Sequence, residues 1–302
     1  DTATTEIYTL SLHDALPISK FNRIKIAAAS VVMLMLASCG GAKADGTQTE
    51  SAQTDGVAVS TIGDITLIAI NDNEGEKRMP NKLFYGDGDS AKVERLSPEG
   101  SVPSSVSCFV VKTQGKTVLF DTGNGTARGG VLLERLSGAG LSPDSIDYLI
   151  LTHFHGDHIG GMMNGGKPVF TRAEVYAPAD EYAYWQTADN PNGRLAMETM
   201  KAYSDRLHLF KYGDALPLGI KAMAAPGHTP GHTVYQTGRL FIAGDLMHGF
   251  DLQIQDLSIC PSYDINPEQA AETRRKYVEY VRKNKLITAG MHFPGSGVKD
   301  SL

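Results

Sequence analysis

Residues 152–161 have the sequence THFHGDHIGG, which places three histidines and an aspartate within six positions. The preceding SIDYLILT is an apolar run that predicts a buried strand. His153 and His155 are two residues apart, so on an extended segment both imidazoles leave the same side of the backbone. Asp157 and His158 follow where the chain must turn, and can serve a second ion beside the first. Polar donors crowded at the end of an apolar strand indicate a metal site, and the alternative is a polar loop with surface histidines.

Further candidate ligands follow downstream, each where an apolar run gives way to a Gly- or Pro-containing loop. APGHTPGHT contains His228 and His232, LFIAGD ends on Asp245, and GMHFPG contains His292. We therefore expect these side chains to converge at one edge of a sheet.

The motifs HFHGDH, GHTPGH, AGD and MHFPG, in this order, resemble those of the metallo-β-lactamase-fold hydrolases. FDTG at residues 120–123 resembles the early strand-end motif of that fold, and the resemblance covers residues 57–302. GHTPGHTVY, GDLMH, DINPEQAAETRRK and the closing HFPG are most similar to the methyl-parathion-hydrolase-like branch. The resemblance implies an α/β fold, a four-layer αββα sandwich with a dinuclear metal site at one edge.

This resemblance also implies a ligand set for two divalent metal ions. One ion is expected on His153, His155 and His232, the other on Asp157, His158 and His292, with Asp245 as the bridge between them. The family ligand in GHTPGH is the second histidine, so His228 is expected to orient a ligand. Asp121 is expected to hydrogen-bond the ligand loop rather than a metal. Zinc is the favoured ion, and mixed N/O ligation also admits Mn²⁺, Fe²⁺ or Co²⁺.

The implied function is hydrolysis of a small ester, lactone or phosphotriester by a metal-bridging hydroxide, with Asp157, Asp245 and His248 as the catalytic candidates. Asp245 stands where many β-lactamases have a cysteine or no ligand, which argues against antibiotic hydrolysis. His248 stands where quorum-quenching lactonases often have a tyrosine. This favours the methyl-parathion-hydrolase-like branch and leaves an acyl-homoserine-lactone-type lactonase as an alternative. Two other readings stay open, a metal-binding lipoprotein without turnover and a nuclease of the same superfamily.

Two side chains have alternative interpretations. His248 either donates a proton or hydrogen bond to the substrate or packs near the cleft. Trp185, the one tryptophan, either lines an aromatic mouth over the metals or anchors its helix to the core.

The 302-residue chain has a formal net charge of −6 and no Lys/Arg cluster along one face, so nucleic acid is not an expected partner. The expected partner is a small-molecule substrate. The oligomeric state stays open, a homodimer being one option.

The N-terminal region predicts export and lipid anchoring. Residues 1–19 are expected to be a non-native tail, and residues 20–38 a lipoprotein signal peptide, because basic residues precede a twelve-residue apolar stretch. LASC at residues 36–39 resembles a bacterial lipobox, which implies lipidation of Cys39; an ordinary secretory signal is the alternative. Residues 39–60 are expected to be a flexible tether and residues 61–302 the hydrolase domain. The expected location is the bacterial cell envelope, lipid-anchored to the membrane, periplasmic or surface-facing.

Nine strands are predicted from the runs DITLIAI, VSCFVVK, KTVLFD, IDYLILT, AEVYA, RLHLF, IKAMAA, TVYQT and RLFIAGD. Helices are predicted over residues 130–137, 178–187, 192–204 and 267–283, the last with Asn266 as N-cap. Arg274, Arg275 and Lys276 are expected to face solvent. Cys108 is expected to be buried in a strand. A disulfide between Cys108 and Cys260 is possible but is not required by the sequence. The chain ends ten residues after His292, so a short or missing closing strand is expected.

Overall fold

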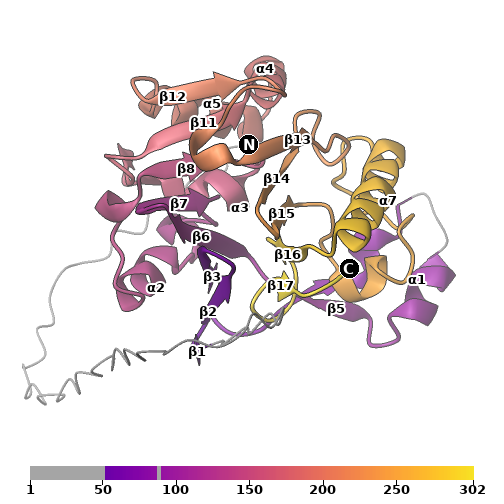
Figure 1. Cartoon of the computed structure of the whole chain (residues 1–302). Coiled ribbons are helices and arrows are strands. Elements are labelled where there is room, and N and C mark those ends of the chain that lie inside the picture. The colour runs from indigo at the N-terminus through magenta and orange to yellow at the C-terminus, as the bar shows by residue number, and fades with distance from the viewer. Residues whose placement is uncertain (1–51, 87–89) are drawn as a thin grey trace, which may run out of the picture. The chain divides into compact units, whose positions relative to one another are not determined.

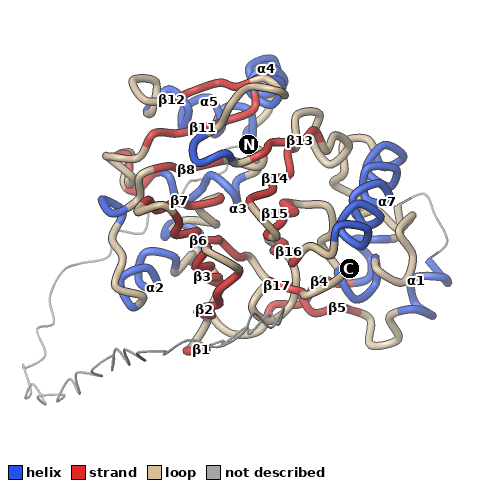
Figure 2. Tube along the Cα trace, in the orientation of Figure 1, coloured by secondary structure: helices blue, strands red, loops and turns tan. Residues whose placement is uncertain are grey.

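The structure of the chain is a computed structural model that describes residues 52–86 and 90–302 (Figures 1 and 2). The expectations for residues 1–19 and 20–38, for lipidation of Cys39, and for most of the tether lie outside the described residues. Within the described residues, no helix combines the length and the apolar character that crossing a membrane requires.

The larger sheet has eight strands and separates two layers of core. Its strands lie in the order β1 (Ala52–Thr54), β2 (Val57–Ile62), β3 (Ile65–Asn71), β6 (Ser107–Thr113), β7 (Lys116–Phe120), β8 (Tyr148–Ile150), β11 (Glu174–Pro178) and β12 (Leu207–Phe210). Successive side chains along β6 point to opposite faces of the sheet, and both faces are covered because the side chains on each are apolar. Cys108 and Val110 belong to one apolar cluster, whereas Phe109 and Val111 belong to another.

A five-stranded sheet forms the second β layer. Its strands lie in the order β13 (Lys221–Ala224), β14 (Thr233–Thr237), β15 (Leu240–Gly244), β16 (Ile287–Gly290) and β17 (Val298–Lys299). Along β15, Leu240 and Ile242 join the cluster that Phe109 belongs to, so the two sheets pack face to face. Phe241 and Ala243 face the opposite way, into a third cluster.

Helices cover the two outer faces of the sheets. In chain order the helices of the described residues are α1 (Ser90–Leu96), α2 (Leu132–Gly138), α3 (Gly156–Ile159), α4 (Ala179–Thr187), α5 (Pro191–Ala202), α6 (Phe250–Gln253) and α7 (Pro267–Asn284), with 3-10 turns η1 (Asn81–Phe84), η2 (Thr126–Arg128), η3 (Pro143–Ser145), η4 (Gly160–Met162) and η5 (Pro217–Gly219). Leu136 of α2 and Met200 of α5 pack against the larger sheet, and Val278 of α7 packs against the smaller one (Figure 1). The layers are therefore α, β, β and α, which confirms the predicted four-layer sandwich.

All nine predicted strands and all four predicted helices form, with ends shifted by a few residues. Asn266 caps α7 as predicted, because its side chain accepts a hydrogen bond from the Gln269 N–H at 3.1 Å. Cys108 is buried as predicted, and neither it nor Cys260 is in a disulfide. The short closing strand is β17, which pairs with β16.

The start of the domain differs from the prediction. β2 begins at Val57 and pairs with β3 over six residues, so residues 57–60 belong to the fold and not to a flexible tether. The apolar run VAVSTI supplies the strand, and Val57 and Ile62 are buried. A second unanticipated feature lies between β3 and β6, where a hairpin of β4 (Lys77–Pro80) and β5 (Ser101–Ser104) encloses η1 and α1.

Candidate metal centre

Four segments far apart in the sequence meet at one edge of the sandwich. The HFHGDH segment follows β8, Asp245 follows β15 and His292 follows β16, while His228 lies in the loop between β13 and β14. β15 and β16 are parallel, so their carboxyl ends lie side by side. The structure thus brings most of the predicted ligands together at the predicted place.

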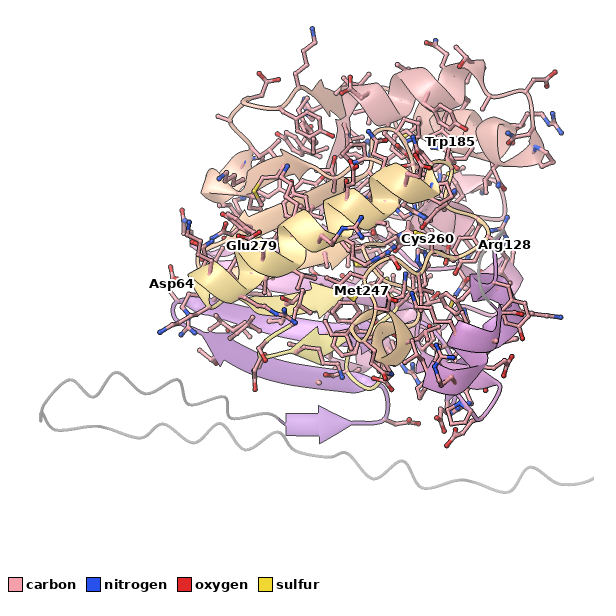
Figure 3. All side chains as sticks on the ribbon, turned by 90° about the vertical axis from the view of Figure 1, so that its right-hand side faces the viewer. Asp64, Arg128, Trp185, Met247, Cys260 and Glu279 are labelled. Atoms are coloured by element: carbon pink, nitrogen blue, oxygen red, sulfur yellow. The ribbon has the colours of Figure 1, made fainter. Side chains whose placement is uncertain are left out.

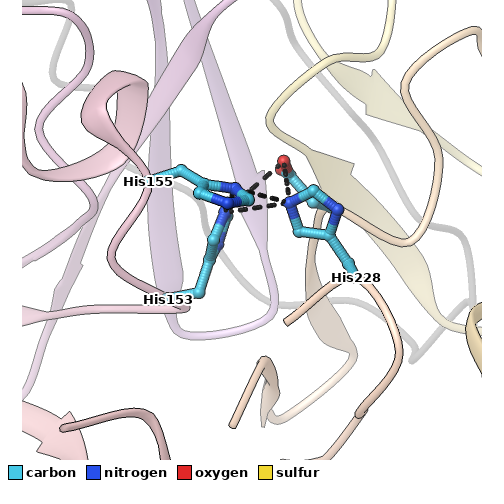
Figure 4. A group of neighbouring side chains, drawn as sticks. His153, His155 and His228 are labelled. Carbon is cyan, nitrogen blue, oxygen red and sulfur yellow. Dashed lines mark hydrogen bonds and ion pairs between the residues drawn. The ribbon is translucent and has the colours of Figure 1, made fainter. Parts of the chain in front are cut away.

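The first donor group consists of His153, His155, His228 and Asp245. His155 Nδ1 lies 2.8 Å from His228 Nε2 and 3.0 Å from His153 Nε2. His228 Nε2 lies 3.2 Å from Asp245 Oδ2, and Figure 4 shows the three imidazoles pointing at one another. Zinc–nitrogen bonds of about 2.0–2.1 Å give a tetrahedron with edges of about 3.3 Å, so these spacings suit a single tetrahedral cation.

His232 is outside this group, and the expectation that it is the ligand in place of His228 stays a prediction. Its Nδ1–H donates to the Ala225 carbonyl at 2.9 Å, and its Nε2 accepts from the Asp245 N–H, also at 2.9 Å. Both ring nitrogens are therefore occupied by backbone partners. The ring lies beneath Gly244, where a Cβ would come within 2.4 Å of Nε2. His232 thus hydrogen-bonds the Asp245 loop, whereas His228 Nε2 faces His155 of the donor group.

The second donor group consists of Asp157, His158 and His292. His292 Nε2 lies 3.5 Å from Asp157 Oδ2, and His158 Nε2 lies 3.9 Å from Asp157 Oδ1. Asp245 faces both groups, because its Oδ1 lies 3.2 Å from His158 Nε2 and its Oδ2 lies 3.2 Å from His292 Nε2. Asp245 thus lies between the two groups, and its role as a bridge stays a prediction.

Hydrogen bonds at the far side of each ring fix which nitrogen faces the centre. His228 Nδ1–H donates to Asp264 at 2.8 Å, His158 Nδ1–H to Asp121 at 2.7 Å, and His292 Nδ1–H to a backbone carbonyl at 2.8 Å. In the neutral form of each ring, Nε2 then carries a lone pair aimed at the other donor atoms of the centre. His158 Nε2 is buried and has no hydrogen-bond partner, as does Asp245 Oδ1. Acceptors that converge without donors suit a bound cation.

The charges around the centre favour cations. Burial and the charge of His228 lower the pKa of His155 to about 3. Burial also opposes a charge on His228, but Asp245 and Asp264 outweigh it and raise the His228 pKa to about 9. Burial opposes ionisation of Asp245, yet the charge of His158 and its neighbours holds that pKa well below its usual value. The carboxylate therefore stays ionised at neutral pH, and a metal ion would compete with protons for the imidazoles.

Asp121 supports the ligand loop, as predicted. Its carboxylate accepts from the Thr152 N–H at 2.8 Å, the Thr152 hydroxyl at 2.7 Å and His158 Nδ1–H. Its φ of 56° is unusual for a residue other than glycine, and this backbone conformation is held by a hydrogen bond from the Asp121 N–H to the Ile150 carbonyl.

Arg274 was expected to face solvent, and this prediction is wrong. Its side chain is only 1% exposed, and its Nη1 donates to the Ile259 carbonyl at 2.9 Å. Nε donates to the Leu246 carbonyl at 2.6 Å, and Nη2 lies 3.6 Å from Asp264 Oδ2. The guanidinium thus links the loop after Asp245 to the carboxylate that orients His228.

Glu181 is a functional residue that the sequence did not reveal. Its buried carboxylate accepts from the Phe154 N–H at 3.0 Å, the Thr229 hydroxyl at 2.7 Å and the Trp185 indole N–H at 2.6 Å. It therefore joins both ligand loops to α4. Trp185 is 3% exposed and packs in the core, so the anchoring interpretation of this residue holds.

Five residues of the two donor groups line a cavity of about 400 Å³, namely His155, Asp157, His228, Asp245 and His292. Its other walls include Met79, Asn124, Arg128, Asn192 and Tyr263. His248 also lines the cavity, with its Nε2 at 2.9 Å from Asp245 Oδ2 and its ring stacked on His292 at 4.9 Å.

Comparisons with known proteins agree with this geometry. Residues 102–287 match the family described as the metallo-beta-lactamase superfamily. An N-acyl homoserine lactonase of Bacillus thuringiensis is 25% identical over 222 residues, which cover 64% of this chain and 82% of the relative. A ribonuclease Z of Pyrococcus abyssi is 42% identical over 80 residues, but the match spans only 22% of that relative and 26% of this chain.

Two solved structures share the fold over most of their length. The hydrolase AbOPH has a TM-score of 0.74 at 28% identity, covering 82% of this chain and 93% of its own. AidC, a dizinc quorum-quenching lactonase, has a TM-score of 0.73 at 26% identity, covering 83% of this chain and 94% of its own. By its family match, its layers and its convergent histidines, the chain belongs to the metallo-beta-lactamase superfamily.

Proposed function

We propose that this chain is a dinuclear metallohydrolase that cleaves a small ester, lactone or phosphotriester. The observation that carries the proposal is that two groups of donor atoms share Asp245 at the floor of a cavity. The proposed ligands of the first ion are His153, His155, His228 and Asp245, and those of the second are Asp157, His158, His292 and Asp245.

The donor set favours zinc, because imidazole nitrogen and carboxylate oxygen are its usual ligands in hydrolases. Manganese, iron and cobalt share this preference in part and are alternatives. Bound ions of this kind supply an activated water and polarise the carbonyl or phosphoryl group that the water attacks. No serine or cysteine nucleophile is then required.

The chain's own residues position these reactants. Asp157 and Asp245 provide fixed negative charge, and His248 Nε2–H donates to Asp245 Oδ2 and thereby orients that carboxylate. We propose that His248 also contacts the substrate, because it lines the cavity. Met79 and Tyr263 provide apolar surface for the part of the substrate that does not react.

A second candidate is a lactonase of the acyl-homoserine-lactone type. It is favoured by the lactonase relative, which the match covers over 82% of its length, and by the similarity to AidC. The GHTPGHTVY and GDLMH motifs support the methyl-parathion-hydrolase-like branch instead. Rates on lactones and phosphotriesters, measured side by side with the same preparation, discriminate between the two candidates. A metal-binding lipoprotein without turnover would bind both ions but would hydrolyse neither lactones nor phosphotriesters.

The proposed location is the cell envelope, with the chain anchored to the membrane by a lipid on Cys39. The supporting observation is the LASC motif after a basic and apolar segment. The Cys39→Ser substitution should release the protein from the membrane fraction. Retention of the variant would contradict the anchor. The proposed partner is a small-molecule substrate, with a homodimer as one form of the protein.

Metal content and turnover test the proposal together. Elemental analysis should find about two divalent ions per chain, following the number of donor groups. The His153→Ala and Asp245→Ala variants should lose hydrolysis, whereas His208→Ala is the matched control because His208 is an exposed histidine of β12. Unchanged turnover in either site variant would overturn the assignment. Full metal loading without turnover of any ester, lactone or phosphotriester would favour the lipoprotein that binds metal without catalysis.

A further inference from the structure

Arg128 lies at the rim of the cavity, beside the second donor group. It is the last residue of η2, its side chain is exposed, and it lines the same cavity as Asp157. The guanidinium packs over the backbone of Gly156, because a Cβ on that glycine would lie 2.0 Å from Arg128 Nη1. Figure 3 labels Arg128 and Trp185 on the same side of the domain.

The turn that carries Arg128 is held firmly by the buried carboxylate of Asp72. This carboxylate accepts from the Asn124 N–H at 2.6 Å and from the Leu132 N–H at 2.8 Å, one before and one after the turn. The Arg128 N–H closes the turn by donating to the Gly125 carbonyl at 3.0 Å. The position of the arginine backbone relative to the cavity is therefore fixed by the fold.

Arg128 has no counter-ion among the described residues; other exposed arginines such as Arg95 and Arg172 also have none, but they do not line the cavity. Arg78, Arg194 and Arg206 each pair with a carboxylate, at 2.7, 3.4 and 2.9 Å. A guanidinium is charged at every physiological pH, and its planar fork matches a carboxylate or phosphate.

The walls of the cavity do not neutralise this charge. Its two carboxylates, Asp157 and Asp245, both belong to the donor groups, and Met79, Asn192 and Tyr263 are uncharged. With the proposed ions bound, the floor of the cavity is positive as well. The cavity therefore favours a ligand that carries negative charge at a distance from the reacting bond.

We propose that Arg128 binds a carboxylate on the part of the substrate remote from the scissile bond. The inference rests on the proposed function, because the two donor groups are what would hold the reacting end. It narrows the substrate class to esters or lactones that carry an acidic substituent. Arg128 is then a specificity-determining residue for these substrates.

Two matched esters test the inference on the metal-loaded, full-length protein. 4-Nitrophenyl hydrogen glutarate and 4-nitrophenyl valerate both have five-carbon acyl chains. The first chain ends in a carboxylate and the second in a methyl group. Wild-type kcat/KM should favour the acidic ester. This ratio should fall about twofold to fivefold in Arg128→Gln, since an ion pair at a solvated rim contributes about that factor. Arg128→Lys should keep part of the preference. Arg194→Gln, on an exposed arginine of α5, should leave the ratio unchanged.

A binding measurement separates this inference from the proposed function. Calorimetric titration with glutarate and with valerate compares a dicarboxylate and a monocarboxylate without any turnover. Glutarate should bind about twofold to fivefold more tightly to the wild type, and Arg128→Gln should lose that advantage. If neither ester is cleaved, the proposed function fails while the titration still decides on Arg128. If the ester ratio and the glutarate advantage survive Arg128→Gln, the inference about Arg128 is overturned even where hydrolysis is normal.

Discussion

The His232→Ala substitution should lower the free energy of unfolding and leave the metal donors in place. The substitution removes the acceptor for the Asp245 N–H and the donor for the Ala225 carbonyl, and both backbone groups are buried. An unpaired buried group costs about 1–3 kcal/mol, so the loss is about 2–6 kcal/mol. For a domain of about 250 residues this corresponds to a fall in Tm of roughly 5–20 °C.

The His228→Ala substitution should have the opposite effect: it should lower metal affinity. It removes an Nε2 that lies within 3.2 Å of both His153 Nε2 and Asp245 Oδ2. Loss of a partner outside the ligand shell lowers metal affinity by roughly 10–100-fold, and loss of a ligand should lower it at least as much. Its effect on stability should be clearest in the metal-loaded protein, where bound metal adds to the free energy of unfolding.

Both variants are measured in the same way, by thermal unfolding with and without a chelator and by elemental analysis after dialysis. The expected pattern is a metal-replete but less stable His232→Ala and a metal-depleted His228→Ala. The exposed His208→Ala is the control for loss of an imidazole. If His232→Ala lost an ion while His228→Ala retained two, the donor assignment drawn from the structure would be refuted.

Of three further predictions, two concern groups around the centre and one concerns an ion pair away from it. Asp264→Asn should lower metal affinity by roughly 10–100-fold, measured by competition with a chromophoric chelator, because the carboxylate orients His228; unchanged affinity would contradict that role. Glu181→Gln should lower the free energy of unfolding in urea by about 1–3 kcal/mol, because an amide cannot accept every hydrogen bond that the carboxylate accepts; an unaltered urea midpoint would argue against it. Hydrogen bonds from Lys92 and Ser258 lower the pKa of Asp256 to about 2. The ionised Asp256 should therefore add to the free energy of unfolding at neutral pH, and this contribution should disappear as the pH falls from about 4 to about 2. It is measured as the difference in free energy of unfolding between the wild type and Asp256→Asn. A difference that does not vary with pH would count against this ion pair.

The sequence predicted the parts of the fold that depend on short-range pattern. Alternation along β6 and the apolar run before His153 are local, so the strands could be read from composition and spacing. The N-cap at Asn266 is local in the same sense. β2 was missed because VAVSTI follows a stretch rich in Gly, Ser and Thr, and only its pairing with β3 shows that it belongs to the sheet.

Arg274 illustrates a signal that was present but overlooked. On α7 it is four residues after Ala270, four before Val278 and seven before Val281, all of which are buried. Helical periodicity therefore places it on the inner face, and the expectation of solvent exposure came from its neighbours in the run of basic residues. A charged residue in a buried stripe predicts a buried polar partner, here Asp264.

Motif spacing does not decide between His228 and His232 as the proposed ligand, because both histidines lie in the same short motif and differ only in loop geometry. His232 directly precedes β14, so its ring is directed beneath β15, where Gly244 leaves room for it. His228 lies earlier in the loop, and Asp264, 36 residues away in the sequence, turns its Nε2 towards the centre. The decisive contacts are made by a glycine without a side chain and by a carboxylate on a different segment. Motif spacing carries neither, and only the packing of these segments at one edge of the sandwich determines which imidazole faces the other donors.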